Sequence, residues 1–345
     1  MQDRLHPKHW IEIRDEGLYC KPAHCFIDPH HPVERAIITH GHADHARAGN
    51  HWVVATQATL DIMHLRYAPN AWSEAIALNY EHPISIGTDP NDPVTLTFKP
   101  AGHILGSAQA VIDYRGYRLV ISGDYKRRED PTCPPFAVTP CDVFITEATF
   151  GLPVFTHPPI EHEIQKLLTS LAQFPERCHL VGSYALGKCQ RVILALRSLG
   201  YSKSIYLHGA LVRMCELYQN HGIELGHIVA VNDVEDIRSL AGEIVLAPPS
   251  ALNDRWSRKL PNVLTAMASG WMQIRARSKQ RNAELALIIS DHCDWPELLQ
   301  TIQEVSPSEV WVTHGREEAL VYQAQQMGYA AKALSLVGFE EDDDE

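Results

Sequence analysis

The sequence lacks the segments that would mark a membrane or secreted protein. No run of about 18 apolar residues occurs in it, so no membrane-spanning helix is expected. The stretch 1–10 has no apolar core of the kind that a signal peptide carries. We therefore expect a cytoplasmic protein with no membrane partner.

Cysteine pairs at metal-binding or redox spacing are absent too. The chain has 8 cysteines, and none of them form a Cys-X-X-Cys pair. This spacing argues against a zinc ribbon and against a redox dithiol motif. Reduced thiols are the expectation for a cytosolic protein. Internal repeats of fixed period are missing as well.

Positive charge is in short supply. Lysine and arginine number 30 against 42 acidic residues, which gives a formal net charge of −12 at pH 7. Part of that excess lies at the end of the chain, where we expect residues 339–345 to form a disordered acidic tail. Overall acidity is only weak evidence against a polyanionic substrate, because local patches decide binding.

The chain is long enough for two domains. Of its 345 residues, 45% are hydrophobic, which is ample for a packed core. From residue 156 helical and strand patterns alternate, which is typical of a parallel β-α-β module. Apolar strands that end in polar side chains occur before this segment and again after it. We predict one domain from residues 1–155 and 283–338, with a second domain inserted at 156–282.

The densest group of metal-ligand side chains follows the apolar run 36–39. It contains His40, His42, Asp44 and His45. Imidazole and carboxylate together suit Zn²⁺ and neighbouring divalent ions. In an extended segment His40 and His42 point to the same side, and a bend after them can turn Asp44 and His45 toward a second point. The spacing favours two metals, with chance clustering among 20 histidines as the alternative.

Polar side chains also follow apolar strands elsewhere in the chain. In α/β folds, sites are built at strand ends. Gly102 and Gly106 flank one of these side chains, as expected where a backbone passes close to a neighbour. Asp28 ends another apolar run. It could be a turn cap or a carboxylate that holds one of the ligand histidines, and both roles are kept as alternatives. The strand-end residues are His103 after 94–98, Asp124 after 117–121, Glu147 after 143–146 and His314 after 310–313.

Together these motifs resemble the metallo-β-lactamase fold, an α/β (α+β) four-layer αββα sandwich with a metal site at one edge of its two sheets. Further motifs are similar to those of the β-CASP nucleases, which carry an inserted α/β domain. They are Glu-Ala-Thr-Phe-Gly at 147–151, Ser-Tyr-Ala-Leu-Gly-Lys-Cys-Gln-Arg at 183–191 and Ser-Asp-His at 290–292. The likeness extends to the bacterial DNA-ligase-associated DNA damage response exonucleases through Gly-Leu-Tyr-Cys at 17–20, Ile-Asp-Pro at 27–29 and Ala-Ile-Ile-Thr-His at 36–40.

The resemblance implies two divalent metal ions as cofactors, with zinc favoured and manganese as the alternative. It also implies the roles of individual side chains. His40, His42 and His103 would bind one metal, Asp44, His45 and His314 the other, and Asp124 would bridge them. The catalytic residues would be Asp44, Glu147 as an outer carboxylate, and His292 at the scissile phosphate or the leaving group.

Hydrolysis of a phosphodiester suits this set of residues. Two metals about 3.5–4 Å apart can hold a hydroxide and bind the phosphate oxygens together. In-line attack then places a proton donor at the leaving oxygen, a role for which a histidine such as His292 is suited. Glu147 within reach would favour the protonated form of His292. A purely structural histidine is the alternative.

Basic residues of the inserted segment are the expected contacts to substrate. The turn 182–187 opens a helix, whose N-terminal amides favour phosphate. We expect substrate to bind at Ser183, Lys188, Arg191 and Ser290, with an ordinary strand–helix turn as the alternative. A second basic stretch at 255–281 is interleaved with tryptophans that can stack on bases. For this stretch the alternative is a surface of solvated arginines.

The resemblance implies a two-metal DNA exonuclease in DNA repair, with hydroxide attack on the backbone phosphate and a functional association with a DNA ligase and a helicase. An RNA-processing nuclease of the same family is the alternative. His314 favours RNA, because eukaryotic DNA-acting members usually carry valine at this motif. A small-molecule hydrolase does not explain the long insert between Asp124 and His314. An inactive nucleic-acid-binding subunit would be expected to lack ligands, and every expected ligand is present.

Overall fold

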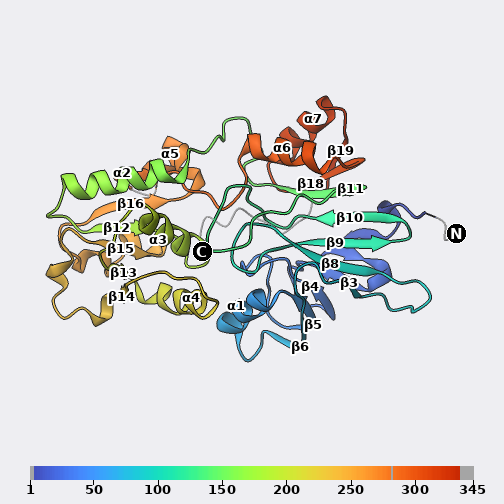
Figure 1. Ribbon diagram of the computed structural model, residues 1–345, viewed down its shortest axis with the longest axis horizontal. Coiled ribbons are helices and arrows are strands. Elements are labelled where there is room, and N and C mark those ends of the chain that lie inside the picture. The colour runs from blue at the N-terminus through green and yellow to red at the C-terminus, as the bar shows by residue number, and fades with distance from the viewer. Residues whose placement is uncertain (1–3, 281–282, 335–345) are drawn as a thin grey trace. The chain divides into compact units, whose positions relative to one another are not determined.

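The structure is a computed structural model that describes residues 4–280 and 283–334. Its contacts divide the chain into two compact units. The first unit runs to Thr156 and resumes at His292, and the second spans His157–Asp291. Figure 1 follows the chain through both units by colour. The predicted acidic tail at 339–345 lies outside the described residues.

The first unit is built on two mixed sheets. The segment 83–93 contributes a short edge strand to the second sheet. The first sheet runs in the order β1 (Ile11–Arg14), β2 (Gly17–Cys20), β3 (Cys25–Ile27), β4 (Arg35–Ile37), β5 (Asn50–Ala55) and β6 (Trp72–Ala77). The second runs in the order β19 (Ala330–Ala333), β18 (Glu309–Gly315), β11 (Val143–Ala148), β10 (Tyr117–Ile121), β9 (Ala108–Tyr114), β8 (Thr95–Pro100) and β7 (Ile84–Ser85).

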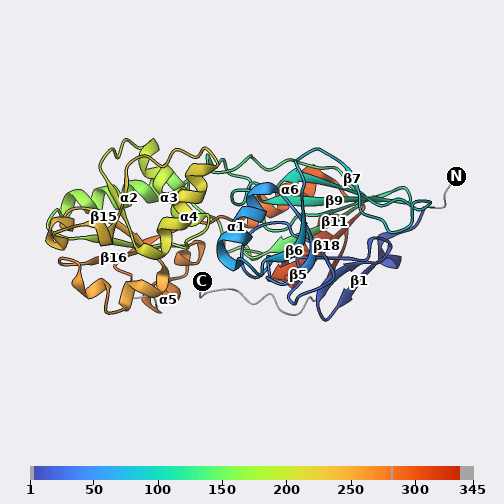
Figure 2. The ribbon, with the colours of Figure 1, turned by 90° about the horizontal axis from the view of Figure 1, so that it is seen from below.

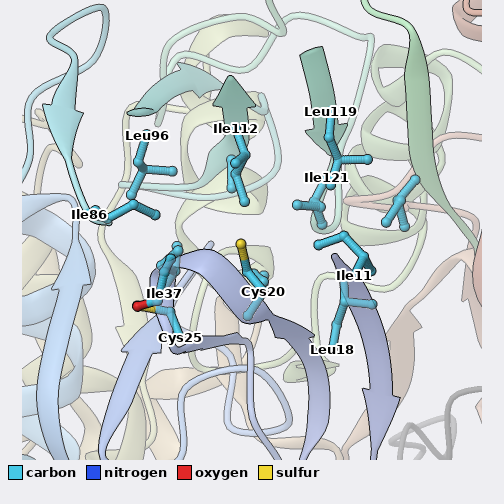
Figure 3. Close-up of a cluster of buried hydrophobic side chains, with 14 of the residues drawn as sticks. Ile11, Leu18, Cys20, Cys25, Ile37, Ile86, Leu96, Ile112, Leu119 and Ile121 are labelled. Atoms are coloured by element: carbon cyan, nitrogen blue, oxygen red, sulfur yellow. The ribbon is translucent and has the colours of Figure 1, made fainter. Parts of the chain in front are cut away.

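The apolar faces of the two sheets pack against each other. Successive side chains of a strand point to opposite faces, so each strand gives every second residue to this layer. Figure 3 shows Ile112 and Leu96 of the second sheet facing Ile37 and Cys20 of the first. All four side chains are buried. Burial of this layer fixes how the strands of the two sheets are placed, and with them the loops at the strand ends.

Helices cover the outer face of each sheet, which completes the predicted αββα sandwich. Helix α1 (Gln57–Tyr67) packs on the first sheet through Leu60 and Met63. Helices α6 (Trp295–Val305) and α7 (Glu317–Gln326) pack on β18 through Ile302 and Leu320. Asp294 and Glu297 form a capping box at the start of α6.

The second unit is a parallel sheet with helices between its strands, as the alternating pattern predicted (Figure 2). Within the described residues, no helix has the length and apolar character needed to cross a membrane. The strand order is β14 (Ile228–Ala230), β13 (Ile205–Leu207), β15 (Ile244–Ala247), β12 (His179–Gly182), β16 (Leu264–Ala268) and β17 (Leu285–Leu287). The helices are α2 (Ile160–Gln173), α3 (Lys188–Ser198), α4 (Gly209–Asn220) and α5 (Arg275–Gln280).

The second unit ends later than the sequence predicted. Strand β17 pairs in parallel with β16 at the edge of this sheet, so the placement of residues 283–291 in the first domain is wrong. The start of the unit at His157 lies next to the predicted residue 156. The pattern misled because an apolar strand followed by polar side chains has the same sequence signature in either domain.

We expect Ile112→Ala to lower the free energy of unfolding by about 2–5 kcal/mol, because it removes a fully buried side chain between the sheets. Ile13→Ala is the matched control. Ile13 is 47% exposed, so its truncation is expected to cost less than about 0.5 kcal/mol. Urea unfolding followed by fluorescence measures both. Equal losses in the two variants would contradict the placement of the core.

Candidate metal centre

The predicted ligands converge at strand ends of the first unit. Asp124 follows β10 and belongs to three groups of candidate ligand atoms among the described residues. Two of them consist of predicted ligands, as expected of a bridging residue, and the third joins it with Glu147 and His292. Within each group, all ligand atoms lie within 4.8 Å of one another. The first group is His40, His42, His103 and Asp124, and the second is His45, Asp124 and His314.

Asp44 lies beside the second group. Its Oδ2 is 3.4 Å from Nε2 of His45, and the same nitrogen is 3.5 Å from Oδ2 of Asp124. The side chain of Asp44 is 22% exposed, whereas that of His45 is 2% exposed. Asp44 therefore reaches the site from its solvent side. The sequence placed Asp44 and His45 at a common second point, and the structure brings them together.

Burial keeps most of the imidazoles neutral. It lowers the pKa of His42 to about 3, with His40 acting in the same direction. Burial likewise lowers the pKa of His314 to about 3 and holds the pKa of His103 well below its usual value. The neutral imidazole is the form that binds a metal. These three side chains are therefore ready to act as ligands at neutral pH.

His45 behaves differently because carboxylates surround it. Burial lowers its pKa, but Asp44, Asp124 and Asp28 outweigh that effect and raise the pKa to about 10. Burial raises the pKa of Asp124, yet His45 and His292 hold it well below its usual value. In the metal-free protein a proton on His45 thus supplies positive charge to a site rich in carboxylates. A divalent cation at the same place would supply it instead.

One buried nitrogen supports a cation here. Nε2 of His40 is buried and makes no hydrogen bond to any residue that the structure describes, although Oδ2 of Asp124 is 3.4 Å away. A buried polar atom without a partner is costly, and a metal ion would satisfy this one. The donors are imidazoles and carboxylates, the set that zinc sites use. The residues present therefore fit the implied metal pair.

Asp28 holds His45, one of the candidate ligands, and is not merely a turn cap. Its Oδ2 accepts hydrogen bonds from Nδ1 of His45 at 2.8 Å and from Oγ1 of Thr39 at 2.6 Å. Its Oδ1 accepts from the backbone N of Thr39 at 2.7 Å. Oγ1 of Thr39 also lies 3.1 Å from Nδ1 of His40. Thr39 was not predicted from the sequence as a residue of the site. Its position between the apolar strand and His40 could have indicated that role.

Two glycines allow the ligand loops to close. Gly102 has φ +73°, and a Cβ there would lie 2.5 Å from the backbone oxygen of Lys126. Gly123 has φ +55°, and its Cβ would lie 2.7 Å from Oγ1 of Thr39. Only glycine adopts such angles without strain. The close backbone approach predicted beside His103 is confirmed.

A carboxylate–imidazole pair flanks the ligands. Nδ1 of His292 donates to Oε2 of Glu147 at 2.9 Å and lies 4.0 Å from Oδ2 of Asp124. Glu147 is buried and also accepts from the backbone N of Tyr125 at 2.8 Å and from Oγ1 of Thr149 at 2.5 Å. The sequence predicted that Glu147 follows its strand, whereas in the structure Glu147 lies within β11. These bonds fix the carboxylate, which in turn orients His292.

The expected substrate-binding residues lie in the second unit and are paired there. Nζ of Lys188 is 2.8 Å from Oδ2 of Asp291, and a guanidinium nitrogen of Arg191 is 3.1 Å from Oδ1. Arg191 also donates to the backbone oxygen of Ser290. Lys188, Arg191 and Ser183 are buried. The sequence missed Asp291 as their partner, although it is the acidic residue of the Ser-Asp-His motif.

The comparisons with known proteins agree with this geometry. Residues 31–176 match the model of the metallo-beta-lactamase superfamily. It is 26% identical over 337 residues to a "Probable DNA ligase" of Opitutus terrae, a match that covers 94% of this chain and 31% of that protein. It is 24% identical over 291 residues to "Cleavage and polyadenylation specificity factor 73" of Drosophila melanogaster, covering 69% of this chain and 42% of the relative.

A third relative is "Endoribonuclease ysh-1" of Neurospora crassa, 34% identical over 160 residues, which covers 43% of this chain and 18% of that protein. The chain thus spans less than half the length of these curated relatives. A crystal structure of a protein of unknown function from Enterococcus faecalis V583 aligns with TM-score 0.57 and 11% identity, over 88% of this chain and 80% of that one. At this identity it shows the fold alone. The predicted resemblance to the metallo-β-lactamase fold and to the β-CASP relatives is confirmed.

We expect Asp28→Asn to weaken binding of the second metal about 10–100-fold, because residues that orient a ligand histidine affect metal affinity to that extent. Asp15→Asn removes an exposed carboxylate nearby in the sequence and serves as the control. Titration with Zn²⁺ by calorimetry measures both variants. Unchanged affinity in Asp28→Asn would show that His45 needs no such support.

Metal binding is expected to release a proton from His45. Its pKa near 10 in the metal-free protein means that it carries this proton at pH 7. A metal at His45 must displace the proton, so affinity should rise about tenfold per pH unit between pH 7 and 9. Calorimetry in buffers of different ionisation enthalpy counts the protons released. Proton uptake, or affinity that falls with pH, would contradict the assignment.

Proposed function

We propose that the protein is a metal-dependent DNA exonuclease that acts in DNA repair. The observation that carries this proposal is the carboxylate–imidazole pair of Glu147 and His292 beside a double set of metal ligands that shares Asp124. Double metal sites of this composition hydrolyse phosphate esters and other acyl or phosphoryl compounds. The added proton donor and the names of the homologous nucleases favour a nucleic-acid backbone as the substrate.

The ligands divide into two sets around Asp124. His40, His42 and His103 would hold one divalent ion, and Asp44, His45 and His314 the other. When bound, such a pair of zinc or manganese ions provides a nucleophile from water at neutral pH and offsets the charge of the phosphate. The chain contributes the placement of these donors. Asp28 and Thr39 hold His45 and His40 in position through the hydrogen bonds described above.

His292 is the proton donor in this proposal. Its Nδ1 donates to Glu147, so Nε2 is the nitrogen that serves the leaving oxygen. Its side chain is 22% exposed, whereas that of Glu147 is fully buried. Substrate can therefore reach the imidazole but not the carboxylate. Glu147 acts through His292, which it orients through this hydrogen bond.

The relatives point to two kinds of nucleic acid. The protein named as a probable DNA ligase matches 94% of this chain, and this near-complete match favours DNA and an association with a ligase. Four relatives named as endoribonucleases match between 36% and 46% of it. We therefore propose DNA as the substrate and keep RNA as the second candidate. Ser183, Lys188, Arg191 and Ser290 remain the proposed contacts to the strand, with Asp291 holding the two cations.

We expect His292→Ala to lower kcat about 10²–10⁴-fold, the usual contribution of a general acid. The variant should still bind two metals, because His292 belongs to neither ligand set. His31→Ala, which removes an exposed histidine, is the control. Steady-state cleavage of a labelled strand and metal analysis of the same samples measure both effects. Loss of metal in His292→Ala would reassign it as a ligand.

The choice of substrate is tested with single- and double-stranded DNA and RNA, labelled at either end, in the presence of Mn²⁺ or Zn²⁺. We expect stepwise shortening of DNA, and we expect Asp124→Asn and His40→Ala to abolish it because each removes a metal donor. Cleavage of RNA alone would overturn the DNA assignment. Turnover of lactams or thioesters without cleavage of either nucleic acid would overturn the nuclease proposal.

A further inference from the structure

Two thiols of the second unit lie in contact. Cys189 is in the first turn of α3 and Cys215 is in α4, and both are fully buried. Their sulfur atoms are 3.8 Å apart. A disulfide requires about 2.05 Å between its sulfurs, so the pair is reduced. The two sulfur atoms would have to move toward each other to form a disulfide bond. The two cysteines are 26 positions apart in the sequence, so their contact was not predictable from the sequence.

Gln190 connects the thiol pair to the turn at 183–187. Its Nε2 donates to Sγ of Cys215 at 3.4 Å and to the backbone oxygen of Ala185 at 2.9 Å. Its Oε1 accepts from the backbone N of Gly187 at 2.9 Å. The Gln190 side chain is buried, so these bonds have no competition from water. The thiols and the turn therefore share one hydrogen-bond network.

This network makes the two thiols unequal. Hydrogen bonds from Cys189 and Gln190 lower the pKa of Cys215, although burial opposes them. The hydrogen bond to Cys215, together with burial, raises the pKa of Cys189 well above its usual value. The thiolate is the reactive form of cysteine. The amide of Gln190 donates to Sγ of Cys215, which favours the thiolate of that residue, so Cys215 is the thiol that a small oxidant attacks and Cys189 is placed to resolve the product.

We propose that Cys189 and Cys215 form a dithiol that a peroxide oxidises to a disulfide, and that this bond releases the turn at 183–187. The thiolate of Cys215 attacks one peroxide oxygen, which yields a sulfenic acid and, after protonation, one water. The thiol of Cys189 then attacks the sulfenic sulfur, the S–S bond forms and a second water leaves. Two thiols are oxidised and one peroxide is reduced.

The disulfide changes the network because its sulfurs must move toward each other. Sγ of Cys215 then leaves Nε2 of Gln190, and a buried amide loses an acceptor. The same amide holds Ala185 and Gly187, so the turn loses support. Lys188 and Arg191 follow in α3. Oxidation would therefore act on the segment that the proposed function assigns to strand binding.

The alternative role for the pair is packing between α3 and α4, since a buried cysteine behaves as a small apolar side chain. The two roles differ in what peroxide does to the native protein. A packing pair stays reduced until the protein unfolds. A functional dithiol closes while the protein is folded.

The test treats the full-length reduced protein with hydrogen peroxide and blocks the remaining thiols. We expect a peptide that links Cys189 to Cys215 and the loss of two free thiols per chain. Amide hydrogen exchange at residues 184–191 should then be at least tenfold faster than in the reduced protein, and a thiol reductant should reverse both changes. Neither readout depends on nuclease activity, so failure of the proposed function leaves the test intact.

Two variants make the result decisive. Cys215→Ser keeps an acceptor for Gln190 and should abolish both the link and the change in exchange. Cys178→Ser removes a thiol that is equally buried in the same unit and has a pKa raised to about 12 by burial, and it should leave both unchanged. Absence of the link in the folded protein would overturn the proposal. So would a link that leaves hydrogen exchange at 184–191 unaltered.

Discussion

The first unit depends on compensating the buried charge of Asp124. This carboxylate is 6% exposed, and a buried charge is stable only with partners of opposite charge or a metal. Imidazole nitrogens of His40, His45 and His292 lie 3.4, 3.5 and 4.0 Å from its Oδ2. His40 and His45 come from the loop after β4 in the first sheet, and Asp124 comes from the loop after β10 in the second sheet. The site therefore exists only while the two sheets remain packed.

The precision of the site comes from residues that would touch no metal. Asp28 and Thr39 join His40 and His45 in one buried hydrogen-bond system. Gly102 and Gly123 let neighbouring backbones approach where any side chain would collide. Glu147 likewise orients His292 and is itself held by hydrogen bonds from Tyr125 and Thr149. Each ligand group is thus oriented by the fold before any ion binds, which is what preorganisation requires.

Local signals were enough to predict many elements. Strand β10 has the expected bounds, 117–121, because a run of apolar residues is a property of a short segment. Long-range pairing was not predictable in the same way. Strand β17 pairs with β16 in the sheet of the second unit. Lys188 and Arg191 form ion pairs with Asp291, about a hundred positions away in the sequence. The candidate ligands lie together as expected, because histidine and aspartate restrict the chemistry of a site, whereas a lysine or an arginine restricts it little.

The central claim is that Asp124 lies between two metal ions held by the strand-end histidines and aspartates. The most direct measurement is a crystal structure of the zinc-loaded protein with anomalous data collected on both sides of the zinc absorption edge. We expect two anomalous peaks, one beside His40, His42 and His103 and one beside Asp44, His45 and His314, with Asp124 contacting both. A single peak, or a pair of peaks that Asp124 does not contact, would contradict it.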